Sequence, residues 1–284
     1  MDRPPAGGVR PDRSRGDEPS DSFYDEVVGV QFAPGIPADY YDRIFAMEER
    51  HWWYAGMGAI SAALLGARVS APGRRVLDAG CGTGGALSRQ QRLGGAAVLA
   101  GVDIGSAAIE LARTRVPEAD LHVAPLVELP FDDASFDLVL TNDVLQHVPE
   151  DDVDASLAEL RRVLAPGGVL LLRTNGARRL RREREDWRAY DRRTLVTTLR
   201  SAGFRCERVT YANTLLSLAA VVQRRTPHAP SEEHHGIPTA PPSGIRAAVG
   251  RTLLRTEASW LVQPVRTMPY GHTLFALAVP ATRS

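Results

Sequence analysis

The stretch VLDAGCGTGG, residues 76–85, decides the fold of this chain. A short apolar run leads into four glycines, and the residues that follow have the composition of a helix. Glycines lack a Cβ, so they let the backbone turn tightly and approach a ligand closely. We therefore predict a buried strand that ends in a nucleotide-binding loop, with Gly80, Cys81, Gly82 and Gly84 against the ligand.

Two acidic residues narrow the choice of ligand. Asp78 stands two residues before the first glycine, where dinucleotide-binding loops usually have an apolar residue, and its carboxylate can hold a cationic amino group or loop N–H groups. A second predicted strand, 97–103, ends at Asp103, about 20 residues after the loop, where a carboxylate can accept both hydroxyls of a ribose. The expected ligand therefore combines a ribose with an ammonium group.

Two further motifs follow in order along the chain. One is Leu129-Pro130-Phe131 with Ser135-Phe136-Asp137, and the other runs from Leu164 to Gly168. With the loop and Asp103, they resemble the ordered motifs of class I S-adenosylmethionine-dependent methyltransferases over residues 70–213. The resemblance implies a doubly wound, mostly parallel seven-stranded sheet, S-adenosyl-L-methionine as the cofactor and methyl transfer as the activity.

The resemblance also implies which residues recognise the nucleoside. Asp103 and Ile104 are expected to bracket the ribose and the adenine. Family members often carry an acid and an alanine at the places of Pro125 and Leu126, and that acid accepts the adenine amino group. Here the backbone groups of Leu126 and Val127 are expected to take over this contact.

Polar residues follow the fourth predicted strand, 136–140. Ligands in such folds lie at the carboxyl ends of strands, so Asn142 and Asp143 are expected to border the methionine part and the acceptor. His147 stands where related small-molecule methyltransferases often carry a histidine, and a neutral imidazole can accept the proton of a hydroxyl acceptor. His51 is the second candidate for this base. The alternative for His147 is a hydrogen bond that shapes the loop.

The aromatic stretch 51–54, His-Trp-Trp-Tyr, resembles a signature that precedes the core in one bacterial subgroup of the family. There the aromatic pair is usually followed by arginines, whereas here the corresponding residues are Ala55, Met57 and Gly58. A guanidinium that pairs with the cofactor carboxylate is therefore missing from this segment. Arg50 and Tyr54 are the candidates to replace it.

Five segments are predicted along the chain. They are a disordered tail (1–21), an N-terminal helical cap (22–69), the S-adenosylmethionine-binding core (70–213), a helical and flexible insertion (214–272) and the closing strand of the core (273–284). The insertion is expected to form a lid, a homodimer surface or a wall of the acceptor pocket.

Other stretches carry subsidiary hypotheses. The apolar segment 215–222 is too short to span a bilayer, so no transmembrane segment is predicted and only peripheral membrane contact is left open. A helix is predicted over 244–257, and Pro269-Tyr270-Gly271 resembles a closing motif of the same subgroup. The basic run 178–184 is either a solvated loop or a grip on a phosphorylated or carboxylated acceptor. The histidines of 226–243 are interpreted as part of a linker, not as metal ligands.

Composition excludes several classes of function. The 284 residues carry 34 basic and 34 acidic side chains, so no global field is available to collect nucleic acid. All the basic residues are arginines, which removes lysine chemistry such as Schiff bases. The 2 cysteines have no metal-ligand spacing, and the N-terminus lacks the apolar core of a signal peptide, so a cytoplasmic location is predicted.

These features together predict a methyltransferase that acts on a small-molecule acceptor, with O-methylation in secondary, saccharide or lipid metabolism as the preferred reaction. One alternative is a cofactor-binding protein without methyl transfer, either a cyclase-type enzyme or a binding subunit. The missing adenine acid and the missing arginines motivate it. Another is an enzyme for membrane-associated acceptors, which rests on 215–222 and Trp260.

Overall fold

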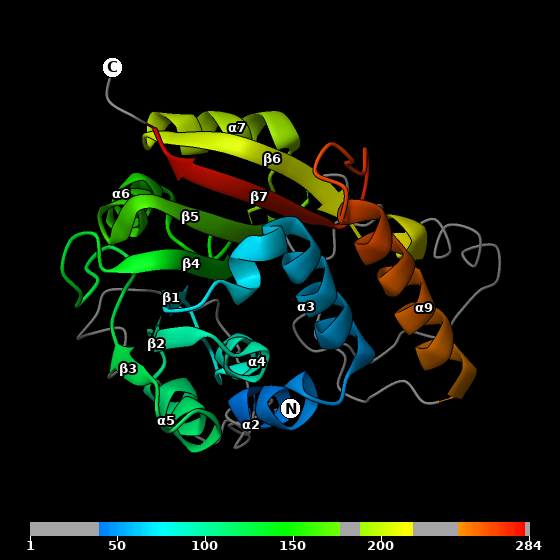
Figure 1. Ribbon diagram of the computed structural model, residues 1–284, viewed down its shortest axis with the longest axis horizontal. Helices are drawn as coiled ribbons and strands as arrows, with labels where there is room; N and C mark the ends of the chain where they lie inside the picture. The colour runs from blue at the N-terminus through cyan, green and yellow to red at the C-terminus, as the bar shows by residue number, and fades with distance from the viewer. Residues whose placement is uncertain (1–39, 177–187, 218–243, 282–284) are drawn as a thin grey trace, which may run out of the picture. The chain divides into compact units, whose positions relative to one another are not determined.

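The computed structural model describes residues 40–176, 188–217 and 244–281, and its centre is a seven-stranded sheet (Figure 1). The strands are β1 (Arg74–Ala79), β2 (Ala96–Asp103), β3 (Asp120–Val123), β4 (Phe136–Asn142), β5 (Leu164–Asn175), β6 (Phe204–Ala212) and β7 (Thr273–Pro280). Their spatial order is β3-β2-β1-β4-β5-β7-β6. Strands β1 to β5 pair in parallel, and β7 runs antiparallel to both β5 and β6. The mostly parallel seven-stranded sheet predicted from the sequence is confirmed.

The strand order reverses at β1, which pairs with β2 on one side and with β4 on the other. Open α/β sheets bind ligands at such a switch point, outside the carboxyl ends of the strands. Strand β1 is buried along nearly its whole length, as its apolar sequence predicts. The glycine loop therefore emerges from the centre of the sheet at the edge where a ligand is expected.

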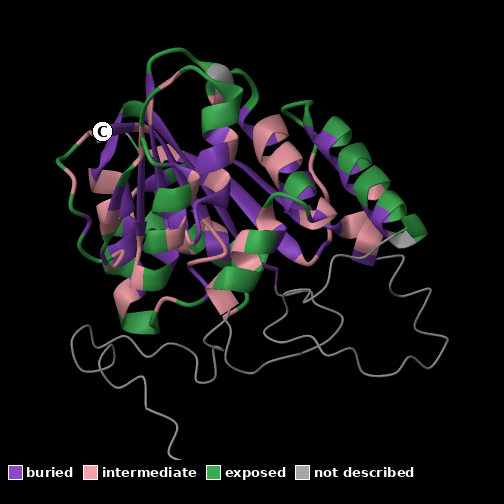
Figure 2. Cartoon of the chain, turned by 90° about the horizontal axis from the view of Figure 1, so that it is seen from below, coloured by how far each residue is buried: buried purple, intermediate pink, exposed green. Residues whose placement is uncertain are grey.

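Helices cover both faces of the sheet. They are α2 (Tyr40–Glu48), α3 (Trp52–Leu65), α4 (Gly85–Leu93), α5 (Ser106–Arg115), α6 (Val153–Arg162), α7 (Arg192–Ser201) and α9 (Gly244–Leu261). The apolar side chains of α3 and α9 pack on one face, and those of α6 and α7 pack on the other. Helices α4 and α5 share a smaller apolar cluster near β2 and β3. Figure 2 shows the strands buried between helices whose outer sides are exposed.

Helices α3 and α9 approach each other closely through two glycines. A Cβ at Gly56 of α3 would lie 2.2 Å from Leu254 of α9, and a Cβ at Gly250 of α9 would lie 2.7 Å from the Trp52 ring. One tryptophan of the aromatic pair therefore packs against α9. Trp53 is also half-buried, beside the end of β5.

Element boundaries differ from the sequence predictions at two places. The sequence predicts a buried strand over 168–173, whereas β5 begins at Leu164 and so includes the Leu164–Gly168 motif; the pairing of β4 with β5 shifts register between Phe136 and Leu138. Helix α9 extends to Leu261, past the predicted end at residue 257. Buried side chains of α9 that pack in the same cluster as α3, Ala258 and Leu261, continue through the added turn and stabilise it.

Several predictions concern residues outside the described ranges. These are the tail 1–21, the first part of the helical cap up to residue 39, the basic run 178–184, and the segments 218–222 and 226–243. Within the described residues, none of the helices has the length and apolar character needed to cross a membrane.

Candidate functional site

The glycine loop after β1 has the backbone that its sequence predicts. Gly80, Gly82 and Gly84 have φ values of 84°, 52° and 81°, in the region that favours glycine. The N–H groups of Gly80 and Cys81 both donate to the Val102 carbonyl, each at 2.8 Å, which ties the loop to β2. A Cβ added at Gly82 would meet no atom within 4 Å, so the space above this residue is open to a ligand.

Cys81 contributes its backbone to the loop, whereas its side chain belongs to the core. The thiol is 4% exposed and packs with Leu87 and Leu121 of the cluster between α4 and α5. Burial raises the pKa of the Cys81 thiol far above its ordinary value, so the sulfur stays neutral and unreactive.

Asp103, at the end of β2, fixes the loop. Its Oδ2 accepts the N–H of Gly82 at 2.8 Å, and its Oδ1 accepts the N–H of Gly105 at 2.9 Å. Burial raises the pKa of Asp103, and these two hydrogen bonds act in the opposite direction. Each carboxylate oxygen keeps a second lone pair, so the predicted contacts with ribose hydroxyls are compatible with this arrangement. The role in holding the loop was not predicted from the sequence.

Asp78 has a different environment at the end of β1. The residue is 2% exposed, and its Oδ1 has no hydrogen-bond partner among the residues that the structure describes. Burial, with a smaller effect of the Glu48 charge, raises the pKa of Asp78 to about 7. A buried carboxylate oxygen without a partner is unfavourable by itself, and a cationic ligand group beside it would remove that cost.

The segment predicted to recognise adenine is held in place by α6. Glu159 of α6 accepts the N–H of Leu129 at 2.9 Å, and Arg162 donates to the Leu129 carbonyl at 3.0 Å. Upstream of this anchor, Leu126 is half-buried and Val127 is 37% exposed. Ile104 is half-buried at the end of β2. Their contacts with adenine stay predictions.

The carboxyl ends of β4 and β5 carry an ion pair that sequence reasoning missed. Arg173 of β5 donates to Asp143 Oδ2 through Nε at 2.9 Å and through a terminal nitrogen at 2.6 Å, and its Cζ lies 5.2 Å from the Trp53 ring centroid. Asp143 has a φ of 59°, uncommon for a residue with a side chain, and directly follows Asn142. The available signal was an arginine at the end of a buried apolar strand.

His147 lies on a turn after β4, exposed on its outer side. Its N–H donates to the Val144 carbonyl at 2.8 Å, and its Nε2 lies 3.5 Å from Gln146 Nε2. The protein packed against the inner side of the ring lowers the pKa of His147, and the charge of Asp143 opposes that shift. The imidazole is therefore neutral near pH 7, the state that a base needs.

His51 caps helix α3. Its Nδ1 accepts the N–H of Trp53 at 3.1 Å, and the residue is 1% exposed. Burial lowers the pKa of His51, so the ring is neutral and its proton lies on Nε2. Neither ring nitrogen can take up a further proton without losing the cap, so the geometry favours His147 over His51 as the base.

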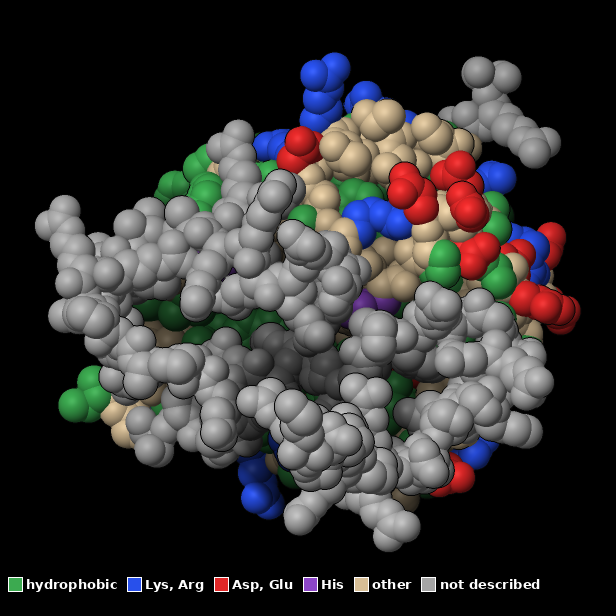
Figure 3. Space-filling view, turned by 180° about the vertical axis from the view of Figure 1, so that it is seen from behind, with side chains coloured by type: hydrophobic (Ala, Val, Ile, Leu, Met, Phe, Trp, Pro, Cys, Tyr) green, Lys and Arg blue, Asp and Glu red, His purple; other side chains and the backbone are tan. Residues whose placement is uncertain are grey.

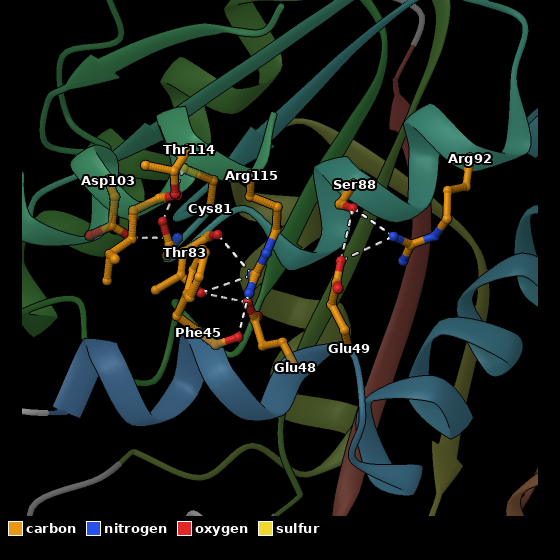
Figure 4. A network of polar contacts seen from close by, with 12 residues as sticks. Phe45, Glu48, Glu49, Cys81, Thr83, Ser88, Arg92, Asp103, Thr114 and Arg115 are labelled. Carbon is orange, nitrogen blue, oxygen red and sulfur yellow. Dashed lines mark hydrogen bonds and ion pairs between the residues drawn. The ribbon is translucent and has the colours of Figure 1, made fainter. Parts of the chain in front are cut away.

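Helix α2 is bonded to the glycine loop, which the sequence did not predict. Arg115 of α5 donates to Glu48 of α2 and to the Thr83 carbonyl, and its guanidinium lies 4.1 Å from the Phe45 ring centroid. A Cβ at Gly85 would lie 2.5 Å from the Glu48 carboxyl carbon. Figure 4 shows α2 running beneath the loop, with Glu48 and Phe45 directed at Arg115.

Two tyrosines from α2 and α3 enter the same region. Burial, with added effects of Asp103 and Asp143, raises the pKa of Tyr40 to about 12. Burial also raises the pKa of Tyr54, which is 8% exposed. Arg50, the other predicted replacement for the missing guanidinium, is exposed on the turn after α2.

The side chains that the structure describes bear on metal binding and on nucleic-acid binding. It contains no group of three or more His, Cys, Asp or Glu side chains placed to hold a metal ion. On the face drawn in Figure 3, basic side chains lie among the acidic ones, so the described residues there form no basic patch for nucleic acid.

Comparisons with known proteins agree with this geometry. Residues 77–172 match the family described as "Methyltransferase domain". A similar curated protein is the malonyl-(acyl-carrier protein) O-methyltransferase of Serratia marcescens, 36% identical over 160 residues, which are 54% of this chain and 61% of that protein. The chain thus spans less than two thirds of the length of this relative.

Solved structures share the fold. Geranyl diphosphate C-methyltransferase from Streptomyces coelicolor A3(2), in complex with Mg²⁺, geranyl diphosphate and S-adenosyl-L-homocysteine, superposes with a TM-score of 0.55 at 16% identity, covering 87% of this chain and 86% of that one. The cyclase SpnF superposes with a TM-score of 0.54 at 21% identity, covering 82% and 84%. At such identities the likeness shows the fold alone.

Residues 77–172 are therefore similar to S-adenosylmethionine-dependent methyltransferase domains, and S-adenosyl-L-methionine is the cofactor that this match indicates. The residues present fit that cofactor. The unpartnered oxygen of Asp78 suits an ammonium group, the open space above Gly82 admits a ligand on bare backbone, and Asp103 retains lone pairs for a ribose.

Proposed function

We propose that this protein transfers the methyl group of S-adenosyl-L-methionine to a small-molecule acceptor, with a hydroxyl oxygen as the preferred target, in secondary, saccharide or lipid metabolism. Two observations on the loop after β1 carry the proposal: Oδ1 of the buried Asp78 has no partner among the described residues, and the backbone at Gly82 faces open space. The similarity to an enzyme named as an O-methyltransferase supports the choice of oxygen.

The residues of this chain mainly bind, orient and exclude water. The sulfonium of the cofactor supplies an electrophilic methyl group, so holding the acceptor in line can supply most of the rate, on the order of 7–11 kcal/mol. The loop residues Gly80, Gly82 and Gly84 would hold the cofactor through their backbone, and α2 would shield it from water. Asn142 and Asp143 would border the acceptor, and His147 would accept its hydroxyl proton at an imidazole nitrogen.

The proposal extends to the surroundings of the enzyme. We place the protein in the cytoplasm, because both cysteines are free and a thiol is stable in a reducing compartment. The exposed apolar side chains of α9 and the turn after it, Ile245, Val249, Trp260 and Val265, would suit a second copy of the chain or a membrane-associated acceptor.

Calorimetric titration of the full chain with S-adenosylmethionine and S-adenosylhomocysteine tests the cofactor site. We expect micromolar binding that Gly82→Asp removes, because the new carboxylate would occupy the open space above the loop. Gly94→Asp is the matched control, since Gly94 also has a positive φ, 70°, with no atom within 4 Å of an added Cβ, but lies at the end of α4. Equal binding by the wild type and Gly82→Asp would contradict this site.

A second candidate is binding of the cofactor without methyl transfer, as a cyclase-type enzyme or a binding subunit. Pro125 and Leu126 in place of the family's adenine contacts favour it, and the fold shared with SpnF is compatible with it. Release of S-adenosylhomocysteine during incubation with a panel of hydroxylated acceptors separates the two. Cofactor binding without release for any acceptor favours the second candidate.

A further inference from the structure

The cofactor ends in an α-amino acid, which carries an ammonium and a carboxylate. Asp78 suits the ammonium. For the carboxylate, the positions just after Trp53 that carry arginines in the related signature have none here. Three arginines lie around the loop in the structure: Arg115, Arg173 and Arg89. Their partners decide which guanidinium is available.

Two of these arginines are already engaged. Arg115 donates to Glu48, to the Thr83 carbonyl and to the Phe45 carbonyl, with its side chain only 5% exposed. Arg173 donates twice to Asp143, with its side chain 9% exposed. Releasing either guanidinium to a ligand would leave a partly buried carboxylate, Glu48 or Asp143, without its cation.

Arg89 is not engaged in this way. It lies on α4, is half-buried, and makes no hydrogen bond or ion pair with a described residue, although Glu48 and Asp78 are charged neighbours. Burial lowers the pKa of Arg89, which still leaves the guanidinium charged at any physiological pH. A half-buried cation that pairs with none of the described residues is the arrangement expected of a group that binds an anionic ligand.

The path of the Arg89 side chain leads toward the loop. Helical side chains tilt toward the helix N-terminus, which for α4 is the end beside Gly84 and Gly85. Arg89 stands one turn after Gly85 on the same side of the helix. The charge of Arg89 lowers the pKa of Asp78 more than the charge of Arg173 does. Arg89 and Asp78 therefore approach the same end of the loop from two directions.

Gly58 of α3 provides the room for this side chain. A Cβ at Gly58 would lie 2.8 Å from Arg89 Cδ and 3.1 Å from Nε. Gly58 is one of the residues that stand where the related signature has arginines. Arg89 of α4 thus fills the space that a side chain at residue 58 of α3 would take.

We propose that Arg89 binds the carboxylate of the cofactor's methionine group while Asp78 binds its ammonium, and that Gly58 makes this possible by leaving the space free. The inference rests on the proposed function, since it assumes that S-adenosylmethionine binds at the glycine loop. It assigns the missing guanidinium to a helix that the sequence did not implicate.

The test pairs two ligands with four forms of the full chain. S-adenosylhomocysteine has the amino-acid group, and 5′-methylthioadenosine shares the nucleoside but lacks that group. Calorimetric affinities are compared for the wild type, Arg89→Met, Arg89→Lys and the control Arg92→Met, which removes an exposed ion pair with Glu49 on the same helix. Circular dichroism and thermal unfolding verify that each variant is folded.

We expect Arg89→Met to weaken S-adenosylhomocysteine about 10- to 100-fold, the usual effect of losing a hydrogen bond to a charged group, and to leave methylthioadenosine unchanged. Arg89→Lys should recover part of the loss, and Arg92→Met should change neither affinity. Unchanged S-adenosylhomocysteine binding by Arg89→Met overturns the inference, and so does an equal loss of both ligands, because a structural role would not distinguish them.

A second variant guards against misfolding of Arg89→Met. Gly58→Ala keeps Arg89 but displaces its side chain, so it should also weaken S-adenosylhomocysteine binding and leave methylthioadenosine binding unchanged. If Gly58→Ala binds both ligands as tightly as the wild type does, the inference is contradicted. Failure of the proposed function has a different signature, since the wild type itself would then bind neither ligand, which overturns both proposals.

Discussion

The ends of β1 and β2 and the ends of β4 and β5 form two halves of one edge of the sheet, built in different ways. On the β1 and β2 side, glycines with positive φ present bare backbone, and each carboxylate oxygen of Asp103 accepts one loop N–H group. On the β4 and β5 side, the surface is made of side chains, with Asp143 bonded to Arg173 and Arg173 beside Trp53.

This difference matches the tasks that we propose for the two halves, cofactor binding for the first and acceptor binding for the second. A fixed cofactor is served by backbone geometry, which a short local sequence can specify completely. An acceptor that differs between enzymes is served by side chains brought together from distant segments, here α3, β4 and β5. The two halves meet at Gly80, whose missing side chain leaves room for Val144 after β4.

The largest effect is expected from adding a side chain at Gly80, where the two halves of the edge are in contact. In Gly80→Ala, the added Cβ would lie 2.1 Å from Val144 Cγ2. The alanine would also have to keep the φ of 84° that Gly80 has. Overpacking and backbone strain together should cost about 3 kcal/mol of unfolding free energy. We expect cofactor affinity to fall by roughly 100-fold or more, since the displaced backbone belongs to the proposed binding surface. Urea denaturation and calorimetry measure the two effects.

Val144→Ala provides the control for this prediction. Trimming Val144 alone should cost little, and in the double variant it should restore part of the stability that Gly80→Ala loses, because the clash is removed while the backbone strain persists. Additive losses in the double variant would show that the two halves of the edge do not touch at this point.

A smaller effect is expected from breaking the ion pair on the acceptor side. Arg173→Met leaves Asp143 without its cation, and we expect a loss of about 2 kcal/mol in unfolding free energy, less than for a fully buried pair because Asp143 is 30% exposed. Asp143→Asn is the matched variant, since asparagine tolerates the φ of 59°. A double-variant cycle with no coupling energy would count against the pair as a structural link.

The same contrast explains how far the sequence could be interpreted. The sheet, the loop and the fixed place of Asp103 follow from apolar runs and from glycine spacing, which are local signals. The pairing of Arg115 with Glu48 joins residues 67 positions apart, and that of Arg173 with Asp143 joins residues 30 apart. The first pair depends on how α2 packs against α5, and the second depends on the pairing of β4 with β5, which local sequence patterns do not specify.

His51 shows the same limit at a single residue. The sequence offered it as a base because imidazole titrates near neutrality, but the start of helix α3 turns its Nδ1 to the Trp53 N–H. Gly58 shows the converse, since the departure from the related signature gains a meaning only when Arg89 is seen beside it.

The last prediction concerns Asp78 and the pH dependence of cofactor affinity. The pKa of Asp78 is raised to about 7 in the ligand-free protein, because burial disfavours the charged form. The native state therefore binds this proton more tightly than the unfolded chain does, and the contribution to stability, present below about pH 4, declines as pH rises toward 7. An ammonium group beside Asp78 reverses the balance by favouring the carboxylate, so cofactor binding should release a proton in this window.

Two measurements follow from that linkage. Cofactor affinity should rise with pH, by up to about tenfold per unit between pH 5 and 7, and level off above. Calorimetry at pH 6 in two buffers of different ionisation enthalpy should report the released proton. Asp78→Asn should flatten both profiles. If the affinity of Asp78→Asn still rises with pH, another group titrates on binding, and the ammonium of the cofactor binds elsewhere at the edge of the sheet.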